Sequence, residues 1–83
     1  MDTLVGKVTH YYDKLGVAIV KIDSDKLALG NTIKFDGPQP EFAQIVDSMQ
    51  LNHQNIAEAT TGAEVGIKVE QPVKENTKVY LVS

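Results

Sequence analysis

The chain contains no cysteine among its 83 residues. Without thiols it can form no disulfide, no thiolate metal site and no cysteine nucleophile. Small secreted domains commonly depend on disulfides, because their cores are too small to stabilise them alone. The absence of cysteine therefore favours a reducing compartment, and we expect a cytoplasmic protein.

Arginine is also missing. All eight basic residues are lysines, and eleven acidic residues give a net charge of −3. Arginine is the side chain that best recognises phosphate and guanine, because its planar guanidinium matches them. An acidic chain without arginine is a poor stand-alone nucleic-acid binder. Its lysines are either ordinary exposed residues interleaved with acids or a local basic face. The candidates for such a face are Lys7, Lys14, Lys21, Lys34, Lys68, Lys74 and Lys78.

Long apolar runs are lacking too. No run is longer than the four residues 17–20, whereas a membrane-spanning helix needs roughly 18 apolar residues. The first residues lack the basic and apolar regions of a secretion signal. The chain also has no Gly-x-x-x-x-Gly-Lys-[Ser/Thr] loop to hold phosphates. We therefore expect no membrane partner, no GTP binding and no GTP hydrolysis.

Short strand-like segments make up most of the sequence. Residues 5–12 and 77–82 are rich in β-branched and aromatic residues, while residues 32–36 and 65–69 alternate between apolar and other residues. Residues 17–22 are almost continuously apolar, which predicts a strand that packs on both faces. No long amphipathic helix separates these segments, so parallel βαβ units are excluded.

These segments predict an all-β fold in one domain, residues 1–83. We expect a small closed antiparallel barrel of six or seven strands, because closure hides the edges of short sheets. The predicted inward side chains are Val8, Val20, Ile22, Ile33, Phe35, Val65, Ile67 and Leu81.

Two segments break the simple pattern. Residues 41–51 have the length of one strand, but their alternation fails, which predicts a β-bulge at residues 47–48. Residues 52–61 are predicted to form a connector with a helical turn near residues 56–59. Gly30 and Gly62 are expected to adopt positive φ in turns. Gly66, in the middle of a strand, indicates the close approach of another backbone.

Four stretches in order resemble the β-barrel of translation proteins, such as domain 2 of elongation factor Tu-like translational GTPases. They are residues 6–12, 27–33, 46–50 and 59–67, and the last is similar to the family's A-x-x-G-x-x-V-G-[I/V]. A similar barrel stands at the C-terminus of some collagenase-like peptidases, and the chain resembles those at least as closely. The resemblance implies the barrel fold.

In elongation factors this barrel helps to hold the aminoacylated end of transfer RNA. The resemblance places the corresponding surface at Ser48, Gln50 and residues 66–69, which include Lys68 and Val69. Serine stands at position 48 where the family has an acidic residue beside the terminal adenosine. The resemblance therefore implies no more than a weak RNA contact.

An aromatic cluster, His10, Tyr11 and Tyr12, is a further candidate site. Adjacent strand residues face opposite ways, so one tyrosine should lie in the core and the other should be exposed. An exposed His/Tyr pair could stack on a base or on a partner's side chain. The alternative is that these residues only complete a half-buried strand. His10 and Tyr11 are retained as candidate partner-binding residues.

Catalytic patterns are weak. Residues 23–25, Asp-Ser-Asp, begin like a calcium loop but lack its glycine and closing glutamate. Ser48, His10 and His53 with an aspartate supply the residue types of a hydrolytic triad without a nucleophile elbow. Two distant histidines make a poor metal site. We expect no enzyme activity, no metal and no cofactor.

The sequence thus predicts a non-catalytic binding module that docks a protein or ribonucleoprotein partner. Two alternatives stay open. The first is an accessory domain of a separately encoded peptidase or RNA-modifying enzyme, and the second is a weak RNA-binding domain. A flat face of lysines and aromatic residues would favour binding, whereas a cleft with converging serine, histidine and aspartate would favour hydrolysis.

Overall fold

The computed structural model describes residues 2–24, 26–37, 41–52 and 54–82. Within these ranges the regular structure is entirely β-strand, which confirms the predicted all-β class. The described part of the chain contains no helix that could cross a membrane. The ten strands are β1 (Asp2–Tyr12), β2 (Val17–Ile22), β3 (Leu27–Ala28), β4 (Thr32–Asp36), β5 (Phe42–Ile45), β6 (Met49–Leu51), β7 (Gln54–Ile56), β8 (Glu58–Ala59), β9 (Glu64–Lys68) and β10 (Lys78–Val82).

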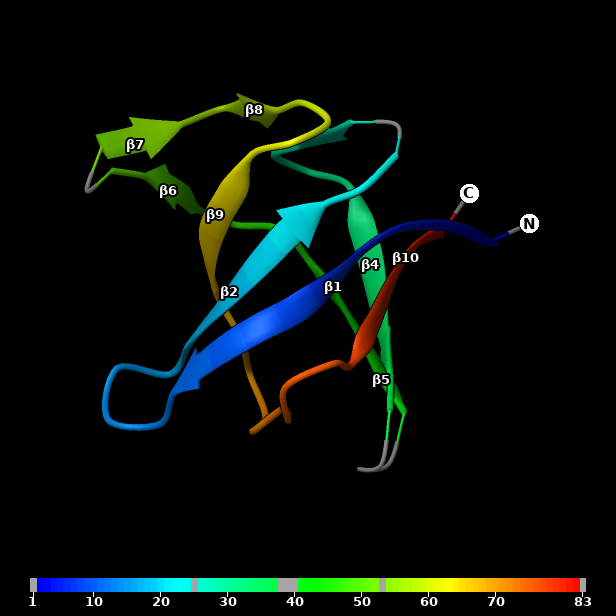
Figure 1. The fold of residues 1–83 in the computed structure, drawn as a ribbon, viewed down its shortest axis with the longest axis vertical. Helices are drawn as coiled ribbons and strands as arrows, with labels where there is room; N and C mark the ends of the chain where they lie inside the picture. Colours follow the sequence, from blue (N-terminus) through cyan, green and yellow to red (C-terminus); the bar gives the residue numbers. More distant parts are fainter. Residues whose placement is uncertain (1, 25, 38–40, 53, 83) are drawn as a thin grey trace.

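Eight strands form one antiparallel sheet in the order β5-β4-β10-β1-β2-β9-β6-β7, and β3 pairs with β8 in a second, two-stranded sheet. The first and last strands are neighbours, with Asp2 opposite Val82. The two ends of the described chain therefore lie side by side (Figure 1). β1 and β2 form a long hairpin that projects at one end of the molecule (Figure 1).

The predicted closed barrel of six or seven strands is wrong. The eight-stranded sheet is a strongly curled half-barrel that stays open, with β5 at one edge and β7 at the other. Residues 41–51 are not one bulged strand but two strands with different partners, since β5 pairs with β4 while β6 pairs with β9 and β7. Residues 47–48, where the bulge was predicted, lie instead in the segment that connects β5 to β6. Val46 and Met49 both point inward across this segment, which explains why the alternation fails.

A buried glutamine joins the two sides of this open sheet. Gln44, on the edge strand β5, is 7% exposed. Its Nε2 donates a hydrogen bond to the carbonyl oxygen of Lys68 (2.8 Å), and its Oε1 accepts one from the backbone N–H of Glu70 (2.9 Å). The amide side chain thus supplies the donor and acceptor that a neighbouring strand's backbone would have supplied. It satisfies polar groups that burial would otherwise leave unpaired.

The core lies inside the curl. Seven of the eight predicted inward side chains are fully buried, and Leu81 is half-buried against them. Phe35 stacks on Phe42 with ring centroids 4.9 Å apart. The alternation of apolar residues therefore predicted the inner face correctly, because one side of each strand must leave water for the sheet to be stable.

Strand β1 carries two bulges that the sequence did not reveal. The pairing register shifts at Val5 against β10 and at Thr9 against β2, so each is an extra residue. The second shift inverts the alternation after Val8. Gly6 lies between the bulges, where an added Cβ would fall 2.0 Å from the carbonyl oxygen of Lys21. The close backbone approach predicted at Gly66 is therefore found at Gly6.

The connector at residues 52–61 differs from its prediction, whereas the predicted turns at Gly30 and Gly62 are confirmed. Residues 54–59 form β7 and β8 rather than a helical turn, because β8 finds a partner in β3. Gly30 and Gly62 adopt φ of 90° and 93°, as predicted. The glycines terminate β3 and precede β9 respectively, where the chain must reverse.

Candidate functional site

The candidate residues Ser48 and Gln50 lie in different hollows. Ser48 is exposed and lines a hollow of about 240 Å³ together with Leu29 and Ile56. Gln50 lines another of about 300 Å³ on the outer face of the sheet. The ligand surface that the resemblance implies is therefore divided between two hollows.

The candidate residues of β9 also separate. Lys68 is exposed and stands opposite Val17 of β2. Val69 is 7% exposed, and its backbone N–H donates to the carbonyl oxygen of Gly16 (2.9 Å). Lys68 is thus available to a partner, whereas the Val69 side chain belongs to the core.

The aromatic cluster divides as expected between core and surface, and the bulge at Thr9 decides which residue goes where. Tyr11 packs against the core, whereas Tyr12 is 45% exposed. His10 lies on the same face as Tyr12, with ring centroids 4.6 Å apart. The exposed pair is therefore His10 with Tyr12, and Tyr11 faces the other way.

No catalytic constellation forms among the described residues. Ser48 has no hydrogen bond to a histidine or aspartate there, and His10 instead contacts Glu75 (Nδ1 to Oε2, 3.3 Å). The described ranges also contain no group of three histidine, aspartate or glutamate side chains that could hold a metal ion. Asp25 and His53, which the sequence placed in a calcium-like loop and a triad, lie outside the described residues.

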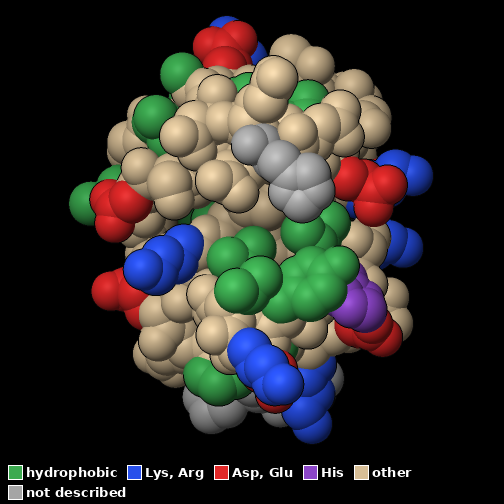
Figure 2. All heavy atoms as spheres, turned by 90° about the vertical axis from the view of Figure 1, so that its left-hand side faces the viewer, with side chains coloured by type: hydrophobic (Ala, Val, Ile, Leu, Met, Phe, Trp, Pro, Cys, Tyr) green, Lys and Arg blue, Asp and Glu red, His purple; other side chains and the backbone are tan. Residues whose placement is uncertain are grey.

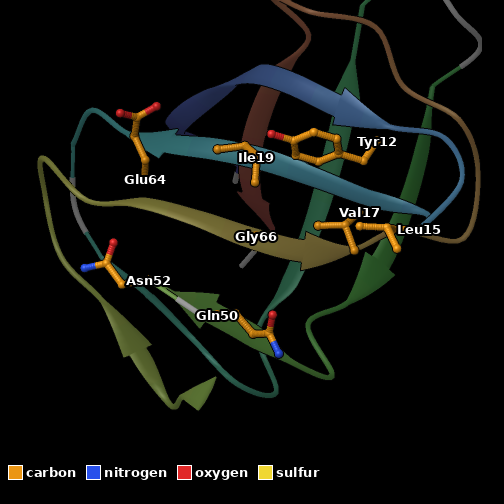
Figure 3. Close-up of a pocket in the computed structure, with 8 residues that line it drawn as sticks. All are labelled: Tyr12, Leu15, Val17, Ile19, Gln50, Asn52, Glu64 and Gly66. Carbon is orange, nitrogen blue, oxygen red and sulfur yellow. The ribbon is translucent and has the colours of Figure 1, made fainter. Parts of the chain in front are cut away.

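The larger hollow, which we call the outer groove, is the most distinctive surface feature. Figure 3 shows Gly66 of β9 at its floor, Tyr12 and Ile19 on one side, and Gln50 on the other. Hydrophobic side chains gather on this face beside a histidine, with both lysines and acidic residues around them (Figure 2). The complete lining is Tyr12, Leu15, Val17, Ile19, Gln50, Asn52, Glu64 and Gly66.

Glycine keeps this groove open. A Cβ added at Gly66 would lie 3.2 Å from Cγ1 of Val17 and 3.5 Å from Cδ1 of Ile19. A larger side chain would therefore fill the space between those two half-buried residues. Leu15, at the tip of the β1–β2 hairpin, is 67% exposed at the end of the groove. Exposed apolar side chains that gather in this way mark interaction surfaces more often than isolated ones do.

Beside the groove runs a row of three lysines on adjacent strands, which we call the lysine row. Lys78 of β10 stands opposite Lys7 of β1, and Lys7 stands opposite Lys21 of β2. Asp36 and Glu64 are the next cross-strand neighbours at the two ends. Like charges directly opposite one another destabilise a sheet. The two contacts within the row, Lys78–Lys7 and Lys7–Lys21, are therefore unfavourable to the fold, whereas its two ends face opposite charges.

The lysines of this face lack close ion-pair partners among the described residues, although Glu64 and Asp36 stand opposite Lys21 and Lys78. Neither the lysine row nor Lys68 forms an ion pair with any described residue. Lys34 differs, because it binds the carboxylate of Asp2 at the start of β1 and lies near Glu41. The Lys34 ammonium holds the pKa of Asp2 below its ordinary 3.8, and Asp2 raises the pKa of Lys34 above its ordinary 10.5.

Sequence reasoning found only part of this surface. It named Gln50, the aromatic cluster and the lysines separately, but it did not predict that they share one face, and it did not select Val17. A usable signal was the continuous apolar run of residues 17–22, which predicted packing on both faces. Its outward apolar members, Val17 and Ile19, are in fact half-buried and line the groove.

The chain is similar to parts of known proteases. It is 35% identical over 79 residues to an uncharacterized protease of Methanocaldococcus jannaschii, and 34% identical over 79 residues to a collagenase of Porphyromonas gingivalis. Both matches cover 94% of this chain but only 19% and 22% of the relatives. The chain thus spans about a fifth of the length of the curated relatives it matches. No protein-family model matches it.

Solved structures agree on the fold. A crystal structure described as the C-terminal domain of a U32 peptidase from Geobacillus thermoleovorans superimposes with a TM-score of 0.90 at 20% identity, covering 98% of this chain and 93% of that one. Its selenomethionine variant gives 0.86 at 22% identity, with 92% and 95% coverage. The resemblance to the barrel of collagenase-like peptidases is confirmed, whereas the closer identification with domain 2 of elongation factors finds no support in these likenesses.

Proposed function

We propose that this chain is a non-catalytic accessory domain that acts together with a peptidase. One observation carries the proposal: nearly the whole chain matches a stretch that makes up only about a fifth of the protease relatives. The similar solved structure is likewise that of a C-terminal domain. Of the alternatives that the sequence left open, the comparisons favour the peptidase-associated one over a translation-factor module.

The surface chemistry supports a binding role rather than a catalytic one. Within the described residues, Ser48 forms no hydrogen bond to a histidine or a carboxylate, and no metal-ligand cluster forms. The outer groove instead offers apolar contacts from Tyr12 and Ile19 in a shallow hollow with polar residues at its rim. Such a mixture is typical of surfaces that bind another chain. In this proposal the domain positions a substrate or docks the catalytic part of its peptidase.

Affinity capture from cells of the source organism tests the association. The tagged chain should recover a peptidase, identified by mass spectrometry, and the purified chain alone should leave gelatin and casein uncleaved. Adding the chain to the recovered peptidase should lower the KM for a protein substrate, because an accessory domain contributes binding rather than chemistry. Heat-denatured chain is the matched control.

Two outcomes would overturn this proposal. The first is cleavage by the purified chain that is lost in Ser48→Ala, which would make the domain an enzyme. The second is recovery of ribosomes or transfer RNA without a peptidase, which would restore the translation-factor interpretation.

A further inference from the structure

The floor of the outer groove lies between two lysines. On β2, Lys21 follows Ile19 by two residues, and on β9, Lys68 follows Gly66 by two. Ile19 and Gly66 stand opposite each other in antiparallel strands, so the lysines lie at opposite ends of this floor. Outward residues two apart on a strand are separated by about 7 Å. Each lysine is therefore one such step from the apolar centre.

These lysines carry charge that no close ion pair among the described residues neutralises. Lys21 and Lys68 have no ion-pair partner among the described residues. Lys7 and Lys78 extend the positive charge away from the groove, across about 10 Å of adjacent strands. This concentration arises in a chain whose net charge is −3. A positive face on an acidic protein steers acidic ligands towards itself.

Two acidic residues limit the length of ligand that fits. Glu64 lines the groove and accepts a hydrogen bond from Thr9 (3.4 Å), and Asp36 closes the far end of the lysine row. A long, uniformly charged nucleic-acid strand would meet both carboxylates. A short peptide can place its acidic residues beside Lys21 and Lys68 and meets only Glu64 of these two carboxylates. The outer groove itself is lined by aliphatic residues, which suit an apolar side chain better than a phosphate.

We propose that the outer groove binds an extended peptide segment of the pattern acid–x–apolar–x–acid. The apolar side chain occupies the space over Gly66, between Tyr12 and Gln50, and the two carboxylates lie beside Lys21 and Lys68. The i, i+2 spacing of an extended peptide matches the separation of the lysines from the floor. This inference rests on the proposed function, in which the segment belongs to the peptidase or its substrate, and it names the chemistry of that partner.

Fluorescence anisotropy with the labelled peptide Glu-Ser-Leu-Ser-Glu tests the inference. We expect saturable binding that weakens as salt rises, because the screening length falls from about 30 Å at 0.01 M to about 8 Å at 0.15 M salt. Two peptides serve as controls. Lys-Ser-Leu-Ser-Lys reverses the charges and Glu-Ser-Ser-Ser-Glu removes the apolar side chain, and both should bind at least about tenfold more weakly.

Substitutions in the protein test the contacts that the peptide controls test in the ligand. Lys21→Glu and Lys68→Glu should each weaken binding by up to about fivefold, and together by at least about tenfold. Gly66→Val should abolish binding by filling the floor, and Glu64→Gln should strengthen it by removing a repelling charge. Lys26→Glu is the matched control, since Lys26 lies outside this face and pairs with Glu58. Equal thermal midpoints would show that the variants remain folded.

Three results would overturn the inference. Binding of the acidic peptide that is unchanged in the Lys21→Glu/Lys68→Glu variant would exclude the lysines. Tighter binding of an oligouridylate than of the acidic peptide would favour nucleic acid. A doubled mass in light scattering that Gly66→Val abolishes would assign the groove to a second copy of the chain. Failure here is distinguishable from failure of the proposed function. Capture of a peptidase by the Lys21→Glu/Lys68→Glu variant would leave the accessory role intact and reject only the groove.

Discussion

The two faces of strand β2 differ in what they contribute. On the inner face, Val20 stands between Val8 and Val65, and all three are 0% exposed. On the outer face, Lys21 stands opposite Lys7, where like charges repel. The inner row is what the sheet needs in order to fold, because removing apolar surface from water is the main favourable contribution. The Lys21–Lys7 contact does not serve stability, which makes a role in binding the more economical explanation for it.

The largest expected effect separates the two faces directly. Ile67→Ala, on the inner face of β9, should lower the free energy of unfolding by about 2 to 5 kcal/mol through a lost contact and a cavity. Ile19→Ala, on the outer face of β2, should lower it by less than about 1 kcal/mol, because that side chain is already partly in water. Urea unfolding monitored by circular dichroism gives both values. Equal losses would show that the outer face also supports the fold.

The next effect concerns the open side of the sheet. Gln44→Met should cost about 1 to 3 kcal/mol, because it leaves the Lys68 carbonyl and the Glu70 N–H without their partner. Gln54→Met, on the exposed edge strand β7, is the matched control and should change the unfolding free energy little. An unaffected Gln44→Met midpoint would mean that water replaces the glutamine amide without cost.

A smaller effect of opposite sign tests the lysine row. Lys7→Glu should stabilise the protein by roughly 0.2 to 1 kcal/mol, because it converts two like-charge pairs with Lys21 and Lys78 into attractive ones. The gain should shrink at high salt. Thermal denaturation of Lys7→Glu and of Lys26→Glu gives the comparison. A destabilised Lys7→Glu would show that the row contributes to folding after all.

The smallest effect is the pH dependence of the Asp2–Lys34 pair. The folded-state pKa of Asp2 is lowered, chiefly by its hydrogen bond from Lys34, so the folded protein binds fewer protons than the unfolded one near that pH. The pair therefore stabilises the protein above the ordinary pKa of 3.8 and loses this contribution as pH falls through the lowered value. Asp2→Asn should unfold more easily than the wild type at neutral pH only. A difference that persisted in strong acid would assign it to packing instead.

The sequence by itself determined the fold class, the inner face and the turns at Gly30 and Gly62. These follow from local rules, because apolar alternation decides which side of a strand is buried and positive φ selects glycine. Among the candidate partner-binding residues, Gln50 and Lys68 came from the family resemblance, and both are exposed. The likeness to peptidase barrels also followed from short motifs in order along the chain.

Only the tertiary structure decided where the curled sheet stays open and which outward residues meet. The bulge at Thr9 moves Tyr12 to the surface and Tyr11 to the core, and alternation cannot reveal a bulge that depends on a partner strand. Gln44 joins β5 to residues 68–70 across 24 positions of sequence, a distance over which no local rule operates. Lys78, Lys7 and Lys21 come from three strands and form a row only through their pairing register. Such registers depend on all the strands of the sheet together, so the surface they create could not be predicted from any one segment.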